Sequence, residues 1–127
     1  MTVALWCVLI AGLLPYAATL TAKSRRDFDN ANPREWLARQ EGFRARAHAA
    51  QLNSFESFPL FAAAVVIADL RGAEQAPINL LALGFVAARV LFMLFYIANL
   101  HVLRSLSWFV AMACTVAMFF VTGAPIG

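Results

Sequence analysis

Four long apolar segments dominate the chain, and each is about as long as a lipid bilayer is thick. They cover residues 2–22, 48–70, 78–100 and 106–124. A helix needs roughly 20 predominantly apolar residues to cross about 30 Å of hydrocarbon, and all four segments are close to that length. Because hydrocarbon offers no partners for backbone N–H and C=O groups, segments of this length must satisfy them internally as α-helices. The sequence therefore predicts an all-α integral membrane protein.

The composition agrees with a membrane protein of one domain. Of the 127 residues, 62% are hydrophobic and 13% are charged, whereas soluble domains have roughly 45–50% apolar and about 25% charged residues. The first segment has no basic start and is too long for the apolar part of a secretory signal, so we interpret it as a retained span. Residues 1–127 are thus predicted to form one domain, and the short connections favour an antiparallel four-helix bundle.

Basic residues concentrate in the connection between the first two spans, residues 23–46. Four spans place this connection and the third one on the same side of the membrane, and both termini on the other side. The two connections hold eight of the ten Lys and Arg residues: Lys23, Arg25, Arg26, Arg34, Arg39, Arg44, Arg46 and Arg104. Loops one and three are therefore predicted to be cytoplasmic and both termini outside. Acidic residues interleave the basic ones, so anionic lipid headgroups are a better partner than nucleic acid.

Two connections carry local predictions. The pair Asn32-Pro33 predicts a turn that leads into a short helix from Arg34 to Arg46. Trp36 in this helix is expected to lie at the level of the lipid headgroups. Residues 101–107 are expected to form a short turn before the last span.

Polar side chains lie inside the second and third spans, where they need partners. Asn53 and Glu56 share one helix face, which Arg46 extends toward the cytoplasmic end. Arg89 and Tyr96 are seven residues apart, again on one face. A charged side chain at the membrane centre costs about 2.5–3.5 kcal/mol or more. Glu56 and Arg89 are therefore expected to point inward and to pair, within one subunit or across two.

Pro59 lies just beyond these polar residues. It has no N–H, so it frees the carbonyl of Phe55 and is expected to bend the helix and widen the space beside the polar pair. Two interpretations stay open: the polar residues lock helix packing or oligomer register, or they form a pocket for an anionic ligand. The stripes that they form toward the cytoplasm favour the pocket. Nothing in the spacing of His48 and His101 predicts a metal site.

The pattern N-x-x-E-x-x-P-x-F at residues 53–61, on the second of four spans, resembles the signature of the MAPEG family, membrane-associated proteins in eicosanoid and glutathione metabolism. Arg89 and Tyr96 look like the Arg and Tyr of the family's third helix, and Arg104 looks like the Arg that opens the fourth. The similarity covers the chain in order, length and topology. It is greatest to a bacterial branch of the family, which implies the bacterial inner membrane.

The resemblance implies a homotrimer that binds glutathione in pockets between neighbouring subunits, open to the cytoplasm. Arg104 is the implied catalytic residue, because a nearby cation lowers the pKa of a thiol and raises the population of its thiolate. A lipophilic small molecule would enter from the membrane lipids. The implied residues for binding the cofactor glutathione are Arg46, Asn53, Glu56, Arg89 and Tyr96.

The chain departs from the family pattern at Ala49, where many glutathione-using members carry Arg. Arg46 or Arg44 would have to replace that guanidinium. Two functions therefore stay open. One is a glutathione-dependent transferase or peroxidase that acts on lipophilic electrophiles. The other is a non-catalytic membrane module that binds lipid or serves as a subunit of a larger membrane complex.

Overall fold

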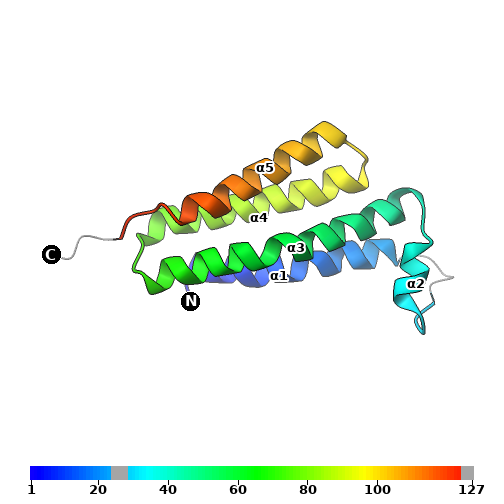
Figure 1. Cartoon of the computed structure of the whole chain (residues 1–127), viewed down its shortest axis with the longest axis horizontal. Coiled ribbons are helices and arrows are strands. Elements are labelled where there is room, and N and C mark those ends of the chain that lie inside the picture. Colours follow the sequence, from blue (N-terminus) through cyan, green and yellow to red (C-terminus); the bar gives the residue numbers. More distant parts are fainter. Residues whose placement is uncertain (24–28, 124–127) are drawn as a thin grey trace.

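A computed structural model describes residues 1–23 and 29–123 as a bundle of antiparallel helices (Figure 1). Its helices are α1 (Val3–Ala22), α2 (Pro33–Ala38), α3 (Gly42–Leu70), α4 (Gln75–Ile97) and α5 (His101–Met118). All of them except the short α2 are long and apolar enough to cross a membrane. The prediction of an all-α membrane four-helix bundle is confirmed. Arg25 and Arg26 of the basic loop lie outside the described residues.

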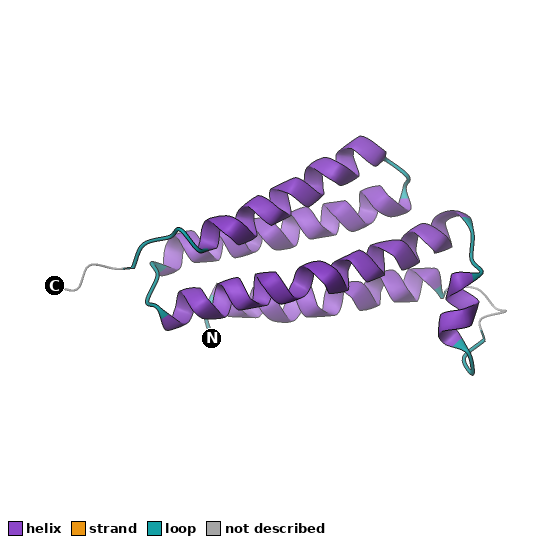
Figure 2. Ribbon diagram, viewed as in Figure 1, coloured by secondary structure: helices purple, strands orange, loops and turns teal. Residues whose placement is uncertain are grey.

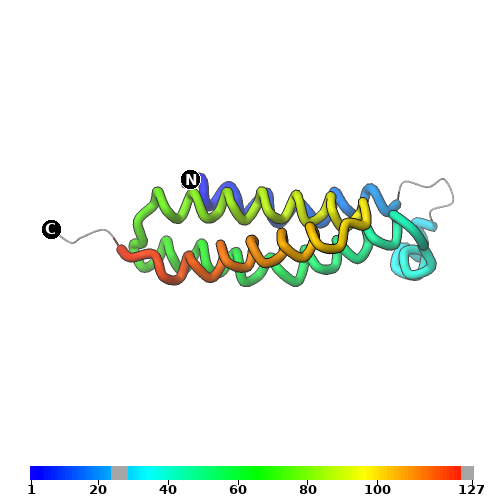
Figure 3. The backbone as a smooth tube through the Cα atoms, turned by 90° about the horizontal axis from the view of Figure 1, so that it is seen from above, coloured from blue at the N-terminus to red at the C-terminus, as the bar shows by residue number. Residues whose placement is uncertain are grey.

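The four long helices form two hairpins, α1 with α3 and α4 with α5 (Figure 2). The connection from α1 to α3 is long and contains α2, whereas those from α3 to α4 and from α4 to α5 are short. α1 packs on α3, α4 packs on α5, and α4 also contacts both helices of the other hairpin. Seen from above, α1 and α4 lie in one layer and α3 and α5 in the other (Figure 3). The N-terminus and the α3–α4 connection lie at one end of the bundle, and α2 and the α4–α5 turn at the other (Figure 1). The described part of the basic loop and the start of α5 therefore share an end.

Small side chains line the buried face of α1 and let its neighbours approach closely. In a membrane the lipid is as apolar as the core, so close packing of small faces is what drives helices together. Opposite this face, the rings of Phe61 and Phe85 stack with centroids 3.8 Å apart, and both are buried. The small residues recur every three or four positions: Ala4, Cys7, Ala11, Pro15, Ala18 and Ala22.

The turn between α4 and α5 is shorter than predicted. Asn99 has a left-handed φ of 64°, and the N–H of Leu100 donates to the carbonyl of Phe95 at 2.8 Å. This is a Schellman motif, which reverses the chain within a few residues, and Asn is one of the few residues besides Gly that tolerates the left-handed position. α5 therefore begins at His101. The expected turn over residues 101–107 is wrong, because these residues form the first two turns of α5.

The connection between α1 and α3 also differs from its prediction. The helix expected from Arg34 to Arg46 is interrupted, because α2 ends at Ala38 and α3 starts at Gly42. Gly42 has a φ of +65°, a conformation that cannot continue a right-handed helix. Trp36 is only 3% exposed and packs in a cluster with residues of α1, α3 and α4. It therefore helps to close one end of the bundle, and its level in the membrane stays a prediction.

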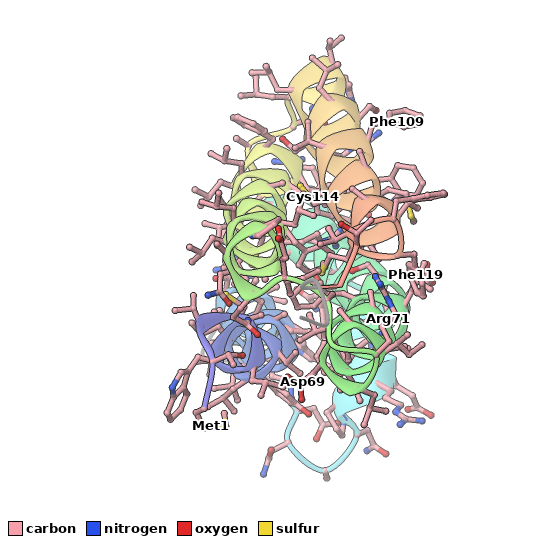
Figure 4. The ribbon with its side chains drawn as sticks, turned by 90° about the vertical axis from the view of Figure 1, so that its left-hand side faces the viewer. Met1, Asp69, Arg71, Phe109, Cys114 and Phe119 are labelled. Atoms are coloured by element: carbon pink, nitrogen blue, oxygen red, sulfur yellow. The ribbon has the colours of Figure 1, made fainter. Side chains whose placement is uncertain are left out.

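The chain after α5 is tied to the α3–α4 connection. Arg71 donates hydrogen bonds to the carbonyls of Met118 at 2.7 Å and Val121 at 2.6 Å. Figure 4 shows Arg71 near Phe119, the residue that follows the last residue of α5. The guanidinium thus satisfies the carbonyl of the last residue of α5, which the helix leaves without a partner, and one carbonyl of the segment that follows. The helix ends at Met118, earlier than the predicted end of the span at residue 124, which lies outside the described residues.

Candidate functional site

A groove of mixed polarity opens between α3, α4 and α5. Its volume is about 260 Å³, and we call it the Arg104 groove. Three of the six predicted site residues line it: Asn53, Tyr96 and Arg104. Arg104 reaches this place because α5 begins at His101, which puts the arginine in the first turn of a rigid helix. The other lining residues are Phe92, Ser105, Trp108 and Phe109.

Arg104 supplies the positive charge of the groove. Its guanidinium carbon lies 4.6 Å from the centroid of the Tyr96 ring, and such a cation–π contact contributes about 0.5–1 kcal/mol at exposed sites. Within residues 1–23 and 29–123, no carboxylate forms an ion pair with Arg104. The side chain is half-buried. Its N–H groups therefore remain available to an anionic ligand.

Arg89 acts on the groove through Asn53 and does not line it. The side chain is buried, with 2% exposure. Its Nη2 donates to Asn53 Oδ1 at 2.9 Å and to Ser54 Oγ at 3.2 Å. A guanidinium has donors only, so Asn53 must turn its oxygen toward Arg89. The amide NH₂ of Asn53 is then left as a donor for a ligand in the groove.

Two aromatic rings in contact with each other connect the two arginines. The guanidinium carbon of Arg89 lies 4.1 Å from the centroid of the Phe92 ring. The rings of Phe92 and Tyr96 meet edge to face at 5.5 Å, and Tyr96 in turn contacts Arg104. The seven-residue spacing predicted one face for Arg89 and Tyr96, and Phe92 lies between them on that face. These contacts orient the Tyr96 ring against which Arg104 rests.

Glu56 does not pair with Arg89 within the described chain, so the intrasubunit form of that prediction is wrong. Its side chain is exposed on α3, among exposed apolar residues such as Leu52 and Leu60. Three helical residues correspond to a rotation of about 300°, which turns Glu56 roughly 60° away from Asn53 and out of the groove. Arg89 instead donates hydrogen bonds to the side-chain oxygens of Asn53 and Ser54, which are uncharged. Pairing of Glu56 across two subunits stays a prediction.

Arg46 and Arg44 lie near this end of the bundle, but neither lines the groove. The Nε of Arg46 donates to the carbonyl of Ile97 at 2.9 Å and so caps the last turn of α4. Arg44 lies over the ring of Phe43, with its guanidinium carbon 4.3 Å from the ring centroid. Neither arginine therefore supplies a second cation to the groove.

Sequence reasoning missed the aromatic part of the groove. Phe92 lies four residues before Tyr96, and Trp108 lies four residues after Arg104. Helical spacing alone places each of them on the same face as its predicted neighbour. Phe109 carries no such signal; it projects from the outer side of α5 (Figure 4) and packs edge to face on Trp108 with centroids 5.0 Å apart.

Comparison with curated proteins and with solved structures returns no match for this chain. The sequence model of the MAPEG family matches residues 3–124. This range includes the four long helices and every residue that lines the Arg104 groove. The match confirms the resemblance that the pattern at residues 53–61 indicated, and the chain belongs to the MAPEG family.

Proposed function

We propose that the Arg104 groove binds glutathione as its thiolate and transfers it to lipophilic electrophiles that enter from the bilayer. The observation that carries this proposal is the state of Arg104: a guanidinium held against Tyr96, open to a groove, with no carboxylate partner in the described part of the chain. Membership of a family associated with glutathione metabolism supports the same ligand.

The polar side of the groove favours an anionic ligand. Asn53 contributes an amide NH₂, Tyr96 and Ser105 contribute hydroxyl groups, and Arg104 contributes charged donors. No acidic side chain is among the lining residues. Hydrogen bonds in which one partner is charged are roughly twice as strong as neutral ones. A donor-rich lining therefore suits a thiolate and the carboxylates of a peptide.

Arg104 would favour the reactive form of the thiol. Two opposite unit charges 4 Å apart attract each other by about 1 kcal/mol in water and by about 4 kcal/mol at an effective dielectric constant of 20. This attraction lowers the pKa of the bound thiol, whose proton leaves to water at the open end of the groove. The thiolate sulfur then attacks the electrophilic carbon. The C–S bond forms while the leaving group departs with the electron pair of the bond that breaks.

The apolar side of the groove suits the second substrate. Phe92, Trp108 and Phe109 form this side, and Phe109 is 64% exposed on the outer surface of α5. In a helix that crosses the membrane, that surface faces lipid. A lipophilic electrophile could therefore reach the sulfur from the bilayer, while glutathione comes from the aqueous end.

A second copy of the chain would complete the site, and we propose a homotrimer. The groove of one subunit, about 260 Å³, is smaller than the roughly 300–1,000 Å³ of most ligand pockets. Glu56 is also exposed on an apolar helix face, where an uncompensated charge costs about 2.5–3.5 kcal/mol. A neighbouring subunit that offers Glu56 a cation or hydrogen-bond donors would remove that cost and extend the groove.

The charges at the two ends of the bundle support the proposed orientation. Among the described residues, the end opposite α2 carries Arg71 as its one basic side chain, whereas the α2 end carries Lys23, Arg34, Arg39, Arg44, Arg46 and Arg104. The positive-inside rule then places the α2 end in the cytoplasm, with both termini outside. In a bacterial inner membrane this orientation opens the groove toward cytoplasmic glutathione.

Replacement of Arg104 tests the catalytic proposal. Purified Arg104→Ala in detergent is expected to lose glutathione conjugation to a general electrophile such as 1-chloro-2,4-dinitrobenzene, while the oligomer stays intact by size-exclusion chromatography with light scattering. Arg34→Ala, an exposed arginine of α2, is the matched control and should keep its turnover. Full activity of Arg104→Ala would refute the proposed role.

A non-catalytic amphiphile-binding protein is the second candidate. Ala49 favours it, and so does Arg46, whose Nε is engaged by Ile97, because neither supplies a second cation to the groove. An anionic headgroup would then rest on Arg104 and its acyl chain on Trp108. Mass spectrometry of the purified protein would show a co-purified lipid or partner protein, and thiol-dependent turnover would be absent.

A further inference from the structure

A small cavity lies inside the subunit, on the opposite side of Arg89 from the Arg104 groove. It is enclosed by α1, α3 and α4, and about 10 Å³ of it is open to the centre of a water-sized sphere. We call it the Arg89 cavity. Its polar lining comes from Arg89, Ser54 and Ser57, and its apolar lining from Ala11, Leu14, Phe58 and Phe85.

Arg89 brings unused hydrogen-bond donors to this cavity. Its Nη2 is engaged by Asn53 and Ser54. Its Nε and Nη1 are buried and have no hydrogen-bond partner among the described residues. A buried charged donor without an acceptor is costly, so such groups in proteins are nearly always satisfied by protein or by ordered water. An acceptor for at least one of these two nitrogens must therefore lie beside the guanidinium.

Within residues 1–23 and 29–123, no side chain accepts a hydrogen bond from either nitrogen. Glu56 points away, on the exposed face of α3. The corresponding group of a second subunit could not reach either, because the two nitrogens are shielded from the surface of the bundle. The acceptor must therefore be a small guest. A single water needs roughly 10–15 Å³ measured in this way, and two to four polar partners.

We propose that the Arg89 cavity is a binding site for one ordered water molecule. The water accepts a hydrogen bond from one of the two free N–H groups of Arg89 and donates one to the hydroxyl oxygen of Ser57. That oxygen can accept, because its own proton is used toward the carbonyl of Ser54 at 3.2 Å. A halide ion could accept from Arg89 as well, but it has no proton to donate to the serine oxygen.

The water would make Ser57 a positioning residue. By accepting a hydrogen bond from the guanidinium, it holds Arg89 in the orientation in which Nη2 reaches Asn53. Asn53 then presents its amide NH₂ to the Arg104 groove. This last consequence rests on the proposed function, whereas the water site itself does not.

An experimental structure of the detergent-solubilised protein in sodium bromide tests the site. The expected result is a density peak within hydrogen-bond distance of Arg89 and Ser57 Oγ that gives no bromine anomalous signal. A structure that resolves ordered water elsewhere in the bundle but shows no peak here would overturn the proposal. An anomalous bromide peak would overturn it too, because the guest would then be an anion.

Two variants of Ser57 extend the test. Ser57→Val fills the cavity and should remove the peak and lengthen the 2.9 Å contact between Arg89 Nη2 and Asn53 Oδ1. Ser57→Ala keeps the space but removes the oxygen to which the water donates, so the peak should weaken without disappearing. Glutathione affinity should fall several-fold in Ser57→Val and by less in Ser57→Ala. If the wild-type protein binds no glutathione, the proposed function fails, but the electron density still tests the water site. An unchanged peak in Ser57→Val would contradict the role of Ser57.

Discussion

Asn53→Asp is expected to stabilise the protein and to weaken its groove. In the wild type, the amide oxygen of Asn53 accepts from Arg89 at 2.9 Å, and its NH₂ remains available to a ligand. A carboxylate at this position would give the buried guanidinium the counter-charge that no described residue supplies. It would also replace a donor at the edge of the groove by an acceptor with a negative charge.

The magnitude follows from the positions of the two groups. Opposite charges about 4 Å apart attract each other by roughly 4 kcal/mol at an effective dielectric constant of 20. Burial of the carboxylate opposes this by several kcal/mol when it is complete, but Asn53 is only half-buried, and Arg89 is already desolvated in the wild type. We therefore expect a net stabilisation of about 1–2 kcal/mol.

Thermal unfolding in detergent measures the first effect. For chains of about this size, 1 kcal/mol corresponds to a shift of roughly 2–8 °C in Tm, so the melting temperature should rise by several degrees. Calorimetric titration with glutathione measures the second effect. The dissociation constant should increase by at least a factor of about 10, which is 1.4 kcal/mol. Asn53→Ala is the control, and it should lower both the Tm and the affinity.

The expected rise in Tm and the expected loss of glutathione affinity can be refuted separately. If Asn53→Asp melts no higher than Asn53→Ala, then Arg89 does not lie within hydrogen-bond distance of position 53. If Asn53→Asp binds glutathione as tightly as wild type, the amide NH₂ does not contribute to the groove.

Three further substitutions test how the helix ends and the α4–α5 contact are built. Arg71→Met removes two hydrogen bonds to carbonyls near the end of α5 and should lower stability by about 1–3 kcal/mol and increase proteolysis after residue 118, whereas cleavage equal to wild type would contradict the tie. Asn99→Val should destabilise by roughly 1–2 kcal/mol because φ is 64° there, while Asn99→Gly should melt at or above the wild-type temperature. An alanine Cβ at position 84 would lie 3.1 Å from the sulfur of Cys114. Gly84→Ala should therefore lower the Tm, and adding Cys114→Ala should partly restore it. Strictly additive effects of the two substitutions would refute the contact.

The end of α4 just before Asn99 could have been predicted from the sequence, but the continuous apolar run does not indicate it. The hydrophobic run of the third span continues to Leu100, so hydropathy alone put the boundary and the next helix too late. Asn in a left-handed position is a local signal for the end of a helix. Reading it moves the start of α5 to His101 and places Arg104 on the helix, beside Tyr96.

The sequence by itself determined the four spans and the helix faces. Each span follows from a requirement that every segment meets alone: enough apolar length to cross the hydrocarbon, with the backbone hydrogen-bonded internally. The faces follow from helical periodicity, which puts Arg89 and Tyr96 on one side of α4 whatever surrounds them. The pattern at residues 53–61 was enough to indicate the family.

Only the tertiary structure decided which polar groups meet. Arg89 donates hydrogen bonds to Asn53 and Ser54 and does not pair with Glu56. The reason is that packing between the helices sets the rotation of α3 against α4. The small face of α1 and the stacked rings of Phe61 and Phe85 define that rotation, and they come from separate segments of the chain. A difference of about 60° around one helix moves a carboxylate from a groove to the surface. The rotation of α3 relative to α4 cannot be predicted from the sequence of either helix alone.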